Sequence, residues 1–158
     1  MSDVAEVKTH LGLWRITEHM GAITKVWIGE GTVAHPPQTP LQQEACRQIE
    51  AYSAGELQQF ELPLSPRGPE FHHQVWQILL RIPFGKTTSY GDIAIELGNP
   101  QLARAVGQAN GKNPIAVLIP CHRVIGKSGQ LTGYAGGLSL KQRLLEHEQG
   151  LVQPRLTF

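Results

Sequence analysis

A short segment rich in proline divides the chain into two parts. Residues 61–69, ELPLSPRGP, hold three prolines and one glycine, a composition that suits neither a helix interior nor a central strand. The charge balance also changes sign here. Residues 1–68 carry five Lys and Arg against eight Asp and Glu, whereas residues 69–158 carry nine against five. We therefore predict an N-terminal β/α domain over 1–62, a linker over 63–69 and a C-terminal domain over 70–158.

The N-terminal domain is predicted to combine a small β-sheet with one helix. Residues 10–33 mix apolar and polar positions in short runs, broken at 19–21 and 29–31, which is typical of strands joined by turns. A proline-rich connection over 33–40 follows. A helix is predicted next, with Gly55 at its end, because apolar residues recur at helical spacing at Leu41, Ala45, Ile49 and Tyr52.

The C-terminal domain is predicted to be mainly helical, which makes the whole chain α+β. One helix carries an apolar stripe from Phe71 to Ile82. Ser89 is predicted to cap a second helix that Gly98 ends, and Asn99-Pro100 to begin a third over 100–110. The tight turn between these two helices predicts a helix-turn-helix. A last helix is predicted with Ser139 as its N-cap, Gln142 completing a capping box, and an end at residues 148–150.

Composition argues against a membrane protein and against a disulfide scaffold. No apolar run approaches the length of a membrane span, and residues 1–6 lack the basic start and apolar middle of a signal peptide. The two cysteines, Cys46 and Cys121, lie far apart in the sequence, so we expect both to be free thiols in a cytoplasmic protein. No Cys or His pairs occur at metal-ligand spacing, and we assign no metal and no cofactor.

Cys121 is the strongest candidate for chemistry. Residues 115–119 form an apolar run that we predict to be a buried strand ended by Pro120, and a thiol, an imidazole and a guanidinium follow directly. A cysteine beside potential cations can have a lowered pKa and react as thiolate, although a lone cysteine is often buried and inert. If His122 takes the thiol proton, an acid must orient it, and Glu148 is a reasonable choice.

The helix predicted over 100–110 has a low profile. Its outer face carries mostly small residues, and Arg104 is the long side chain that projects from it. Small side chains let a backbone approach another surface closely, and that surface is either a nucleic-acid groove or a neighbouring helix. The basic surplus of the second half suggests a polyanionic partner only mildly.

Several motifs of the second half closely resemble those of the O6-alkylguanine-DNA alkyltransferases, also called methylated-DNA–protein-cysteine methyltransferases. They occur in order and with family-like spacing over about residues 69–151: Ser89-Tyr90, Ala103-Arg104-Ala105-Val106-Gly107, Asn113-Pro114, Pro120-Cys121-His122-Arg123-Val124, Tyr134-Ala135-Gly136-Gly137 and His147-Glu148. The resemblance implies DNA repair by direct damage reversal. The alkyl group of O6-alkylguanine would pass irreversibly to Cys121 after the base is flipped out, once per protein molecule.

The resemblance also implies roles for individual residues. Cys121 would be the nucleophile and acceptor, activated through His122, a water and Glu148, while Tyr90 donates a proton to the guanine. The helix over 100–110 would lie in the minor groove of double-stranded DNA, with Arg104 filling the vacated place. The DNA contacts expected are Arg104, Tyr90, Ala103, Gly107 and Arg123. The base pocket expected is Val124, Tyr134, Ala135 and Gly136, and Asn113 and Arg123 would hold the active-site loop. A monomer is expected.

Two features depart from some relatives, and two other functions remain open. Ala135 stands where many relatives have serine, which removes a hydroxyl contact to the lesion, and the N-terminal part lacks the metal-binding cysteines of some relatives. The first alternative function is a non-enzymatic protein that binds alkyl lesions and recruits other repair factors. The second is a cysteine hydrolase that uses Cys121 and His122.

Overall fold

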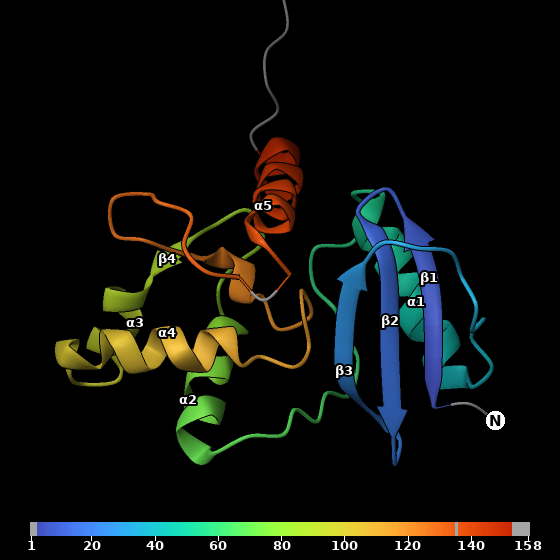
Figure 1. Ribbon diagram of the computed structural model, residues 1–158, viewed down its shortest axis with the longest axis horizontal. Coiled ribbons are helices and arrows are strands. Elements are labelled where there is room, and N and C mark those ends of the chain that lie inside the picture. The colour runs from blue at the N-terminus through green and yellow to red at the C-terminus, as the bar shows by residue number, and fades with distance from the viewer. Residues whose placement is uncertain (1–2, 135, 153–158) are drawn as a thin grey trace, which may run out of the picture. The chain divides into compact units, whose positions relative to one another are not determined.

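The structure, a computed structural model, describes residues 3–134 and 136–152 (Figure 1). This part of the chain forms two compact units. One extends to Arg67 and includes Pro114–Leu118, and the other comprises Gly68–Asn113 and the chain from Ile119 onward. The chain therefore leaves the first unit at Arg67, returns to it for five residues, and continues in the second. The fold is α+β, as predicted.

The first unit contains a three-stranded antiparallel sheet in the order β1-β2-β3. Its strands are β1 Val4–Thr9, β2 Gly12–His19 and β3 Ala22–Gly29. The predicted breaks at 19–21 and 29–31 are confirmed, and Met20 and Gly21 both have positive φ, as a two-residue hairpin turn requires. Strand β1 was not predicted, because Glu6 stands at a buried position and hides its apolar pattern.

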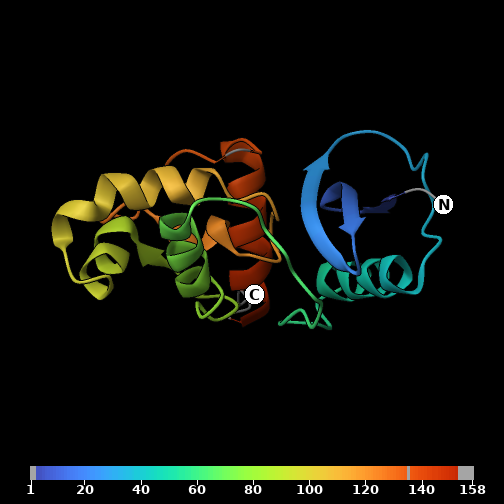
Figure 2. The ribbon, with the colours of Figure 1, turned by 90° about the horizontal axis from the view of Figure 1, so that it is seen from below.

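Helix α1, Pro40–Ser53, covers one face of this sheet by packing on β1 and β2 (Figure 2). Thr39 and Gln42 form a complete capping box at its start. The apolar positions predicted to face inward are fully buried at Ala45, Ile49 and Tyr52. The predicted helix is therefore confirmed.

The second unit is mainly helical, with α2 Glu70–Leu79, α3 Tyr90–Glu96, α4 Ala103–Gly111 and α5 Leu138–Val152. Helix α4 packs against both α2 and α3 (Figure 1). Ser89 caps α3 by accepting a hydrogen bond from the Asp92 N–H, and Gly98 has the positive φ of a residue just past a helix end. The helix predicted over 100–110 begins with one 3-10 turn, η1 Pro100–Leu102, before α4.

Two very short strands tie the start of α3 to the segment that follows the cysteine. β4, Thr88–Ser89, pairs in parallel with β5, Val124–Ile125. This pairing was not predicted, because strands of two residues carry no periodic pattern. It brings Tyr90, the first residue of α3, close to the chain that leaves Cys121.

The predicted strand over 115–119 is wrong. Ile115 makes an isolated bridge to Val26 in β3, and the Ala116 N–H donates to the Val26 carbonyl. The chain then turns at Val117, whose φ is 69, and the Leu118 N–H bonds back to the Ala116 carbonyl. The run is apolar because most of its residues are buried, and not because it is an extended strand.

The predicted bounds of the last helix are also wrong. Helix α5 begins at Leu138, so Ser139 lies in its first turn and is not the N-cap. The first hydrogen bond at this end runs from the Lys141 N–H to the carbonyl of Gly137, which has a positive φ. The helix also continues past Gly150, since a glycine costs a helix only about 1 kcal/mol relative to alanine. No helix in the described ranges is long and apolar enough to cross a membrane.

Candidate active site

Cys121 lies in a buried 3-10 turn, η2 Cys121–Arg123, directly after Pro120. Two asparagines near the end of α4 hold this turn. The Asn110 amide donates to the Cys121 carbonyl at 3.3 Å, and the Asn113 amide donates to the Ile119 carbonyl at 2.8 Å. The role predicted for Asn113 in holding the loop fits this contact, whereas Asn110 was not singled out from the sequence.

His122 and Glu148 form a buried hydrogen-bonded pair. His122 Nε2 lies 2.7 Å from Glu148 Oε2, and both side chains are fully buried. In neutral histidine, Nε2 donates its proton to the carboxylate, which leaves Nδ1 as the acceptor. The Nδ1 atom has no hydrogen-bond partner among the described residues. The imidazole therefore has a free site at which it can take up a proton.

Arg123 completes this cluster from the other side of the carboxylate. Its Nε donates to Glu148 Oε1 at 2.8 Å and its NH2 group to Oε2 at 3.0 Å, while NH1 bonds to the Ile82 carbonyl at 2.7 Å. The guanidinium is buried, and each of its three nitrogens donates to one of these partners. This geometry does not suit the DNA contact expected of Arg123, and it favours the other role, holding the active-site loop.

Burial and charge together set the resting protonation of the cluster. Burial alone would raise the pKa of Glu148, but hydrogen bonds and charges from His122 and Arg123 hold it well below its usual range. Burial lowers the pKa of His122, although Glu148 acts in the opposite direction. Burial also raises the pKa of the Cys121 thiol, against the effect of the Asn113 hydrogen bond. At neutral pH the cluster thus holds a thiol, a neutral imidazole and a carboxylate paired with Arg123.

Lys141 is a further member of the site that the sequence did not reveal. It is fully buried on α5, and its ammonium donates to the Val124 carbonyl at 2.6 Å and to the Thr132 carbonyl at 2.9 Å. Burial lowers its pKa. A usable signal was present, since Lys141 stands at helical spacing from the buried Leu144 and Glu148.

Tyr134 lies beside the thiol. Burial, together with the neighbouring Cys121, raises the pKa of its hydroxyl well above the usual value. The residue that follows it, Ala135, lies outside the described residues. Gly136 is exposed, and a Cβ there would lie 2.7 Å from the Leu140 side chain. Val124 is fully buried, and its carbonyl is bound by Lys141.

Tyr90 reaches the same region from the start of α3. Its hydroxyl lies 2.6 Å from the Thr132 hydroxyl, in the loop that precedes α5. Its ring packs on Gly107, where a Cβ would stand 3.7 Å from the nearest ring carbon. Tyr90 is therefore fixed at both ends, by α4 at its ring and by the loop at its hydroxyl.

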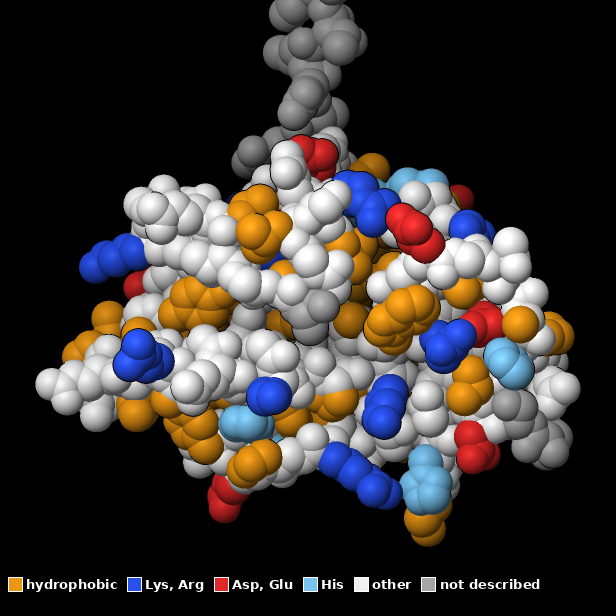
Figure 3. Space-filling view, viewed as in Figure 1, with side chains coloured by type: hydrophobic (Ala, Val, Ile, Leu, Met, Phe, Trp, Pro, Cys, Tyr) orange, Lys and Arg blue, Asp and Glu red, His pale blue; other side chains and the backbone are white. Residues whose placement is uncertain are grey.

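The remaining predicted DNA contacts lie on α4. Arg104 is exposed and Ala103 is half-buried. On the face drawn in Figure 3, Lys and Arg side chains are spread singly over the surface and do not gather in one patch. On this face, charge alone therefore does not mark a nucleic-acid surface.

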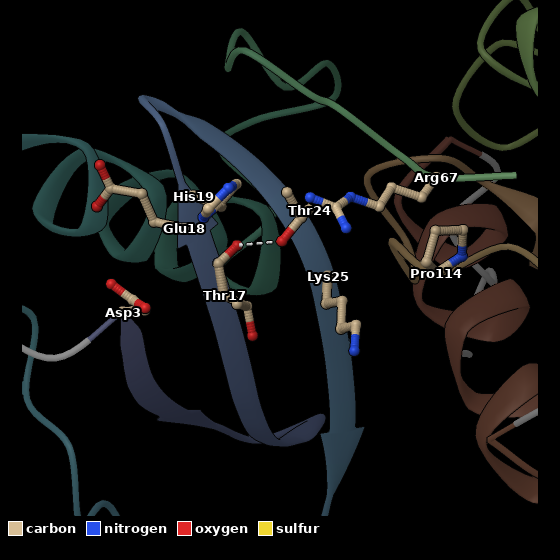
Figure 4. Close-up of a pocket in the computed structure, with 8 residues that line it drawn as sticks. All are labelled: Asp3, Thr17, Glu18, His19, Thr24, Lys25, Arg67 and Pro114. Carbon is tan, nitrogen blue, oxygen red and sulfur yellow. Dashed lines mark hydrogen bonds between the residues drawn. The ribbon is translucent and has the colours of Figure 1, made fainter.

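A separate cavity of about 440 Å³ lies in the first unit (Figure 4). Its wall mixes acidic and basic side chains, and the Thr24 hydroxyl donates to the Thr17 carbonyl across it at 3.4 Å. It contains no cysteine. The residues that line it are Asp3, Thr17, Glu18, His19, Thr24, Lys25, Arg67 and Pro114. Within residues 3–134 and 136–152, no three His, Cys, Asp or Glu side chains lie close enough together to hold a metal ion.

Comparison with known proteins gives one consistent result. The family model described as the 6-O-methylguanine DNA methyltransferase DNA-binding domain matches residues 70–150. The methylated-DNA–protein-cysteine methyltransferase of Mycobacterium leprae is 54% identical over 121 residues, which are 77% of this chain and 73% of that protein. That of Methanosarcina acetivorans is 57% identical over 105 residues, 66% of this chain and 67% of the other.

Solved structures agree with these relatives. The crystal structure of Mycobacterium tuberculosis O6-methylguanine methyltransferase has a TM-score of 0.84 and 42% identity, and the match covers 98% of this chain and 97% of that one. The Mycobacterium tuberculosis protein OGT in complex with DNA has a TM-score of 0.83 and 44% identity, and the match covers 92% of both chains.

Proposed function

The chain belongs to the methylated-DNA–protein-cysteine methyltransferase family, and from this premise we propose that Cys121 accepts the alkyl group of O6-alkylguanine in DNA. The enzyme repairs DNA by alkyl transfer to one of its own cysteines. Of its two cysteines, Cys46 is buried on α1, and burial, helped by the charge of Glu50, raises its pKa to about 11. Cys121 instead stands beside a histidine–carboxylate pair.

The observation that carries the proposal is the buried hydrogen-bond chain from Arg123 through Glu148 to His122. The carboxylate fixes the tautomer of His122 and is placed to stabilise its positive form. Because the resting thiol is protonated, the nucleophile must be generated when the lesion is bound. His122 Nδ1 takes the proton of Cys121, directly or through one water molecule, and Cys121 becomes a thiolate.

The transfer step is then a simple displacement at the alkyl carbon. The thiolate sulfur forms a bond to the alkyl carbon, the bond from that carbon to O6 breaks, and its electron pair leaves with the guanine. Tyr90 donates a proton to the guanine ring, so that the base leaves in neutral form. The products are unmodified guanine and a thioether on Cys121. No group in the cluster can reverse that thioether, so each molecule acts once.

Access to O6 requires that the nucleotide leave the base stack, which costs roughly a few kcal/mol. In this proposal α4 lies in the minor groove of double-stranded DNA, where its small residues at Ala103 and Gly107 permit close approach. The exposed Arg104 enters the stack and occupies the space of the flipped base. By filling this space, Arg104 offsets the free-energy cost of unstacking, and it needs no contact with Cys121 to do so.

Counting the lesions removed per protein molecule tests the proposal. A duplex oligonucleotide with O6-methylguanine is supplied in excess, and the remaining lesion is quantified over time. We expect one lesion lost per molecule and none lost with Cys121→Ser. Cys46→Ser serves as the matched control and should remain active.

The other two functions give different results in the same experiment. A cysteine hydrolase would turn over many times, and a lesion-binding protein would retain the lesion while binding it tightly. Either result would overturn the proposal, as would full activity of Cys121→Ser.

A further inference from the structure

Two hydroxyl groups from distant parts of the chain meet at the edge of the site. Tyr90 Oη and Thr132 Oγ1 lie 2.6 Å apart, although 42 positions separate them in the sequence. Either atom can be the donor. This distance is within the ordinary range of an O–H···O hydrogen bond, and the contact links the first residue of α3 to the loop between β5 and α5.

Thr132 is itself held in place by a buried cation. Its backbone carbonyl accepts a hydrogen bond from Lys141 Nζ at 2.9 Å, and the same ammonium binds the Val124 carbonyl at 2.6 Å. Lys141 is fully buried, so these hydrogen bonds are shielded from competing water. The Thr132 side chain is therefore presented to Tyr90 from an anchored backbone.

The Tyr90 ring is restrained independently. It begins α3 just after Ser89, which pairs with Ile125 through the β4–β5 ladder, and it packs against Gly107 of α4. With the ring fixed, the remaining freedom of Tyr90 is rotation of its O–H bond. The Thr132 hydroxyl is the group in contact with that bond.

We propose that Thr132 is a positioning residue for Tyr90, whose O–H it orients and whose oxygen it stabilises during alkyl transfer. The inference rests on the proposed role of Tyr90 as the proton donor to the leaving guanine. As the Tyr90 proton moves to the base, negative charge develops on the phenol oxygen. Thr132 then donates its own O–H to that oxygen, and a hydrogen bond to a charged partner is stronger than one to a neutral partner.

The experiment measures single-turnover rate constants for four proteins with protein in excess over lesion: wild type, Thr132→Val, Tyr90→Phe and the double variant. Valine keeps the shape of threonine without the hydroxyl, so we expect transfer to slow about five- to tenfold. Thr132→Ser, which restores a hydroxyl, should recover most of the lost rate. Ser128→Ala removes an exposed hydroxyl from the same loop and serves as the control with unchanged rate.

If Thr132 only supported the structure of the loop, the rate constants of the four proteins would follow a different pattern. If Thr132 acts through Tyr90, adding Thr132→Val to Tyr90→Phe should change the rate less than about twofold. The penalty of Thr132→Val should also shrink for alkylated bases that leave more readily, because they need less proton donation. A wild-type rate for Thr132→Val, or an equal penalty in the Tyr90→Phe background, would overturn the inference. A wild-type rate for Tyr90→Phe would instead refute the proposed role of Tyr90.

Discussion

Replacing Glu148 by glutamine removes the negative charge from the centre of the buried cluster and keeps the size of the side chain. The carboxylate accepts hydrogen bonds from His122 and, through both oxygens, from Arg123. Removing one partner of a buried ion pair leaves the other charge uncompensated, at a cost of about 3–5 kcal/mol in the free energy of unfolding. For a protein of this size such a loss lowers Tm by roughly 6–20 °C.

The effect of Glu148→Gln on the rate has a separate cause. Proton transfer from Cys121 makes His122 positive, and without the carboxylate this cation is exposed to the positive charges of Arg123 and Lys141. In a serine hydrolase relay, neutralising the corresponding acid costs about 10⁴-fold. A thiol is more acidic than a hydroxyl, so we expect the loss here to be about 10²- to 10⁴-fold.

Single-turnover kinetics keep the two effects apart. The reaction amplitude reports the folded fraction and the rate constant reports the chemistry, provided that the assay is run well below the Tm of the variant. Glu146→Gln on the same helix is the matched control, because Glu146 is exposed and accepts a hydrogen bond from Gln142, far from any role in the buried cluster. A rate constant for Glu148→Gln within threefold of wild type would refute the relay.

Three further predictions concern other parts of the molecule. Arg104→Ala should slow repair of duplex lesions by at least about tenfold and hardly affect reaction with the free alkylated base; equal losses on both substrates, in paired assays, would exclude a role in the stack. Burial lowers the pKa of His122 from its usual 6.5, so the base form persists at neutral pH. The transfer rate, measured as a function of pH, should therefore fall only below about pH 6.5. A rate that already falls between about pH 8 and 7 would contradict this. Ser89→Ala removes the N-cap of α3 and should lower the free energy of unfolding by about 1 kcal/mol in urea titrations, and an unchanged midpoint would count against the cap.

The pH dependence of stability should follow the same pKa shifts. In the unfolded chain His122 and Glu148 regain their ordinary pKa values of 6.5 and 4.5, above those of the folded state. The unfolded state therefore binds more protons as pH falls, and the stability contributed by these groups, present above those values, is lost on acidification.

Local signals in the sequence predicted several helix ends, although the capping box predicted at Ser139 was wrong. Ser89 and Gly98 mark the two ends of α3 because capping and a positive φ depend on one or two neighbouring residues. Apolar residues at helical spacing predicted α1, because this pattern also lies within the helix itself. The strand predicted at 115–119 was wrong because apolar content indicates burial, and a buried segment does not have to be a strand.

The site itself could be predicted only in part. The sequence named His122 and Glu148, and the structure brings them to 2.7 Å. Lys141 was not singled out, because a lysine in an amphipathic helix is ordinarily exposed and this expectation outweighed its helical spacing from Leu144 and Glu148. Nor did the sequence show the contact of Tyr90 with Thr132, since that depends on the β4–β5 pair, which has no periodic signature.

The central claim is that Cys121 is consumed by the reaction. Intact-protein and peptide mass spectrometry after incubation with a duplex that carries O6-methylguanine tests this claim most directly. The account predicts one added methyl group, located on the peptide that contains Cys121, with Cys46 unmodified and the lesion converted to guanine. An unmodified Cys121 beside a repaired lesion, or a methyl group on any other residue, would contradict it.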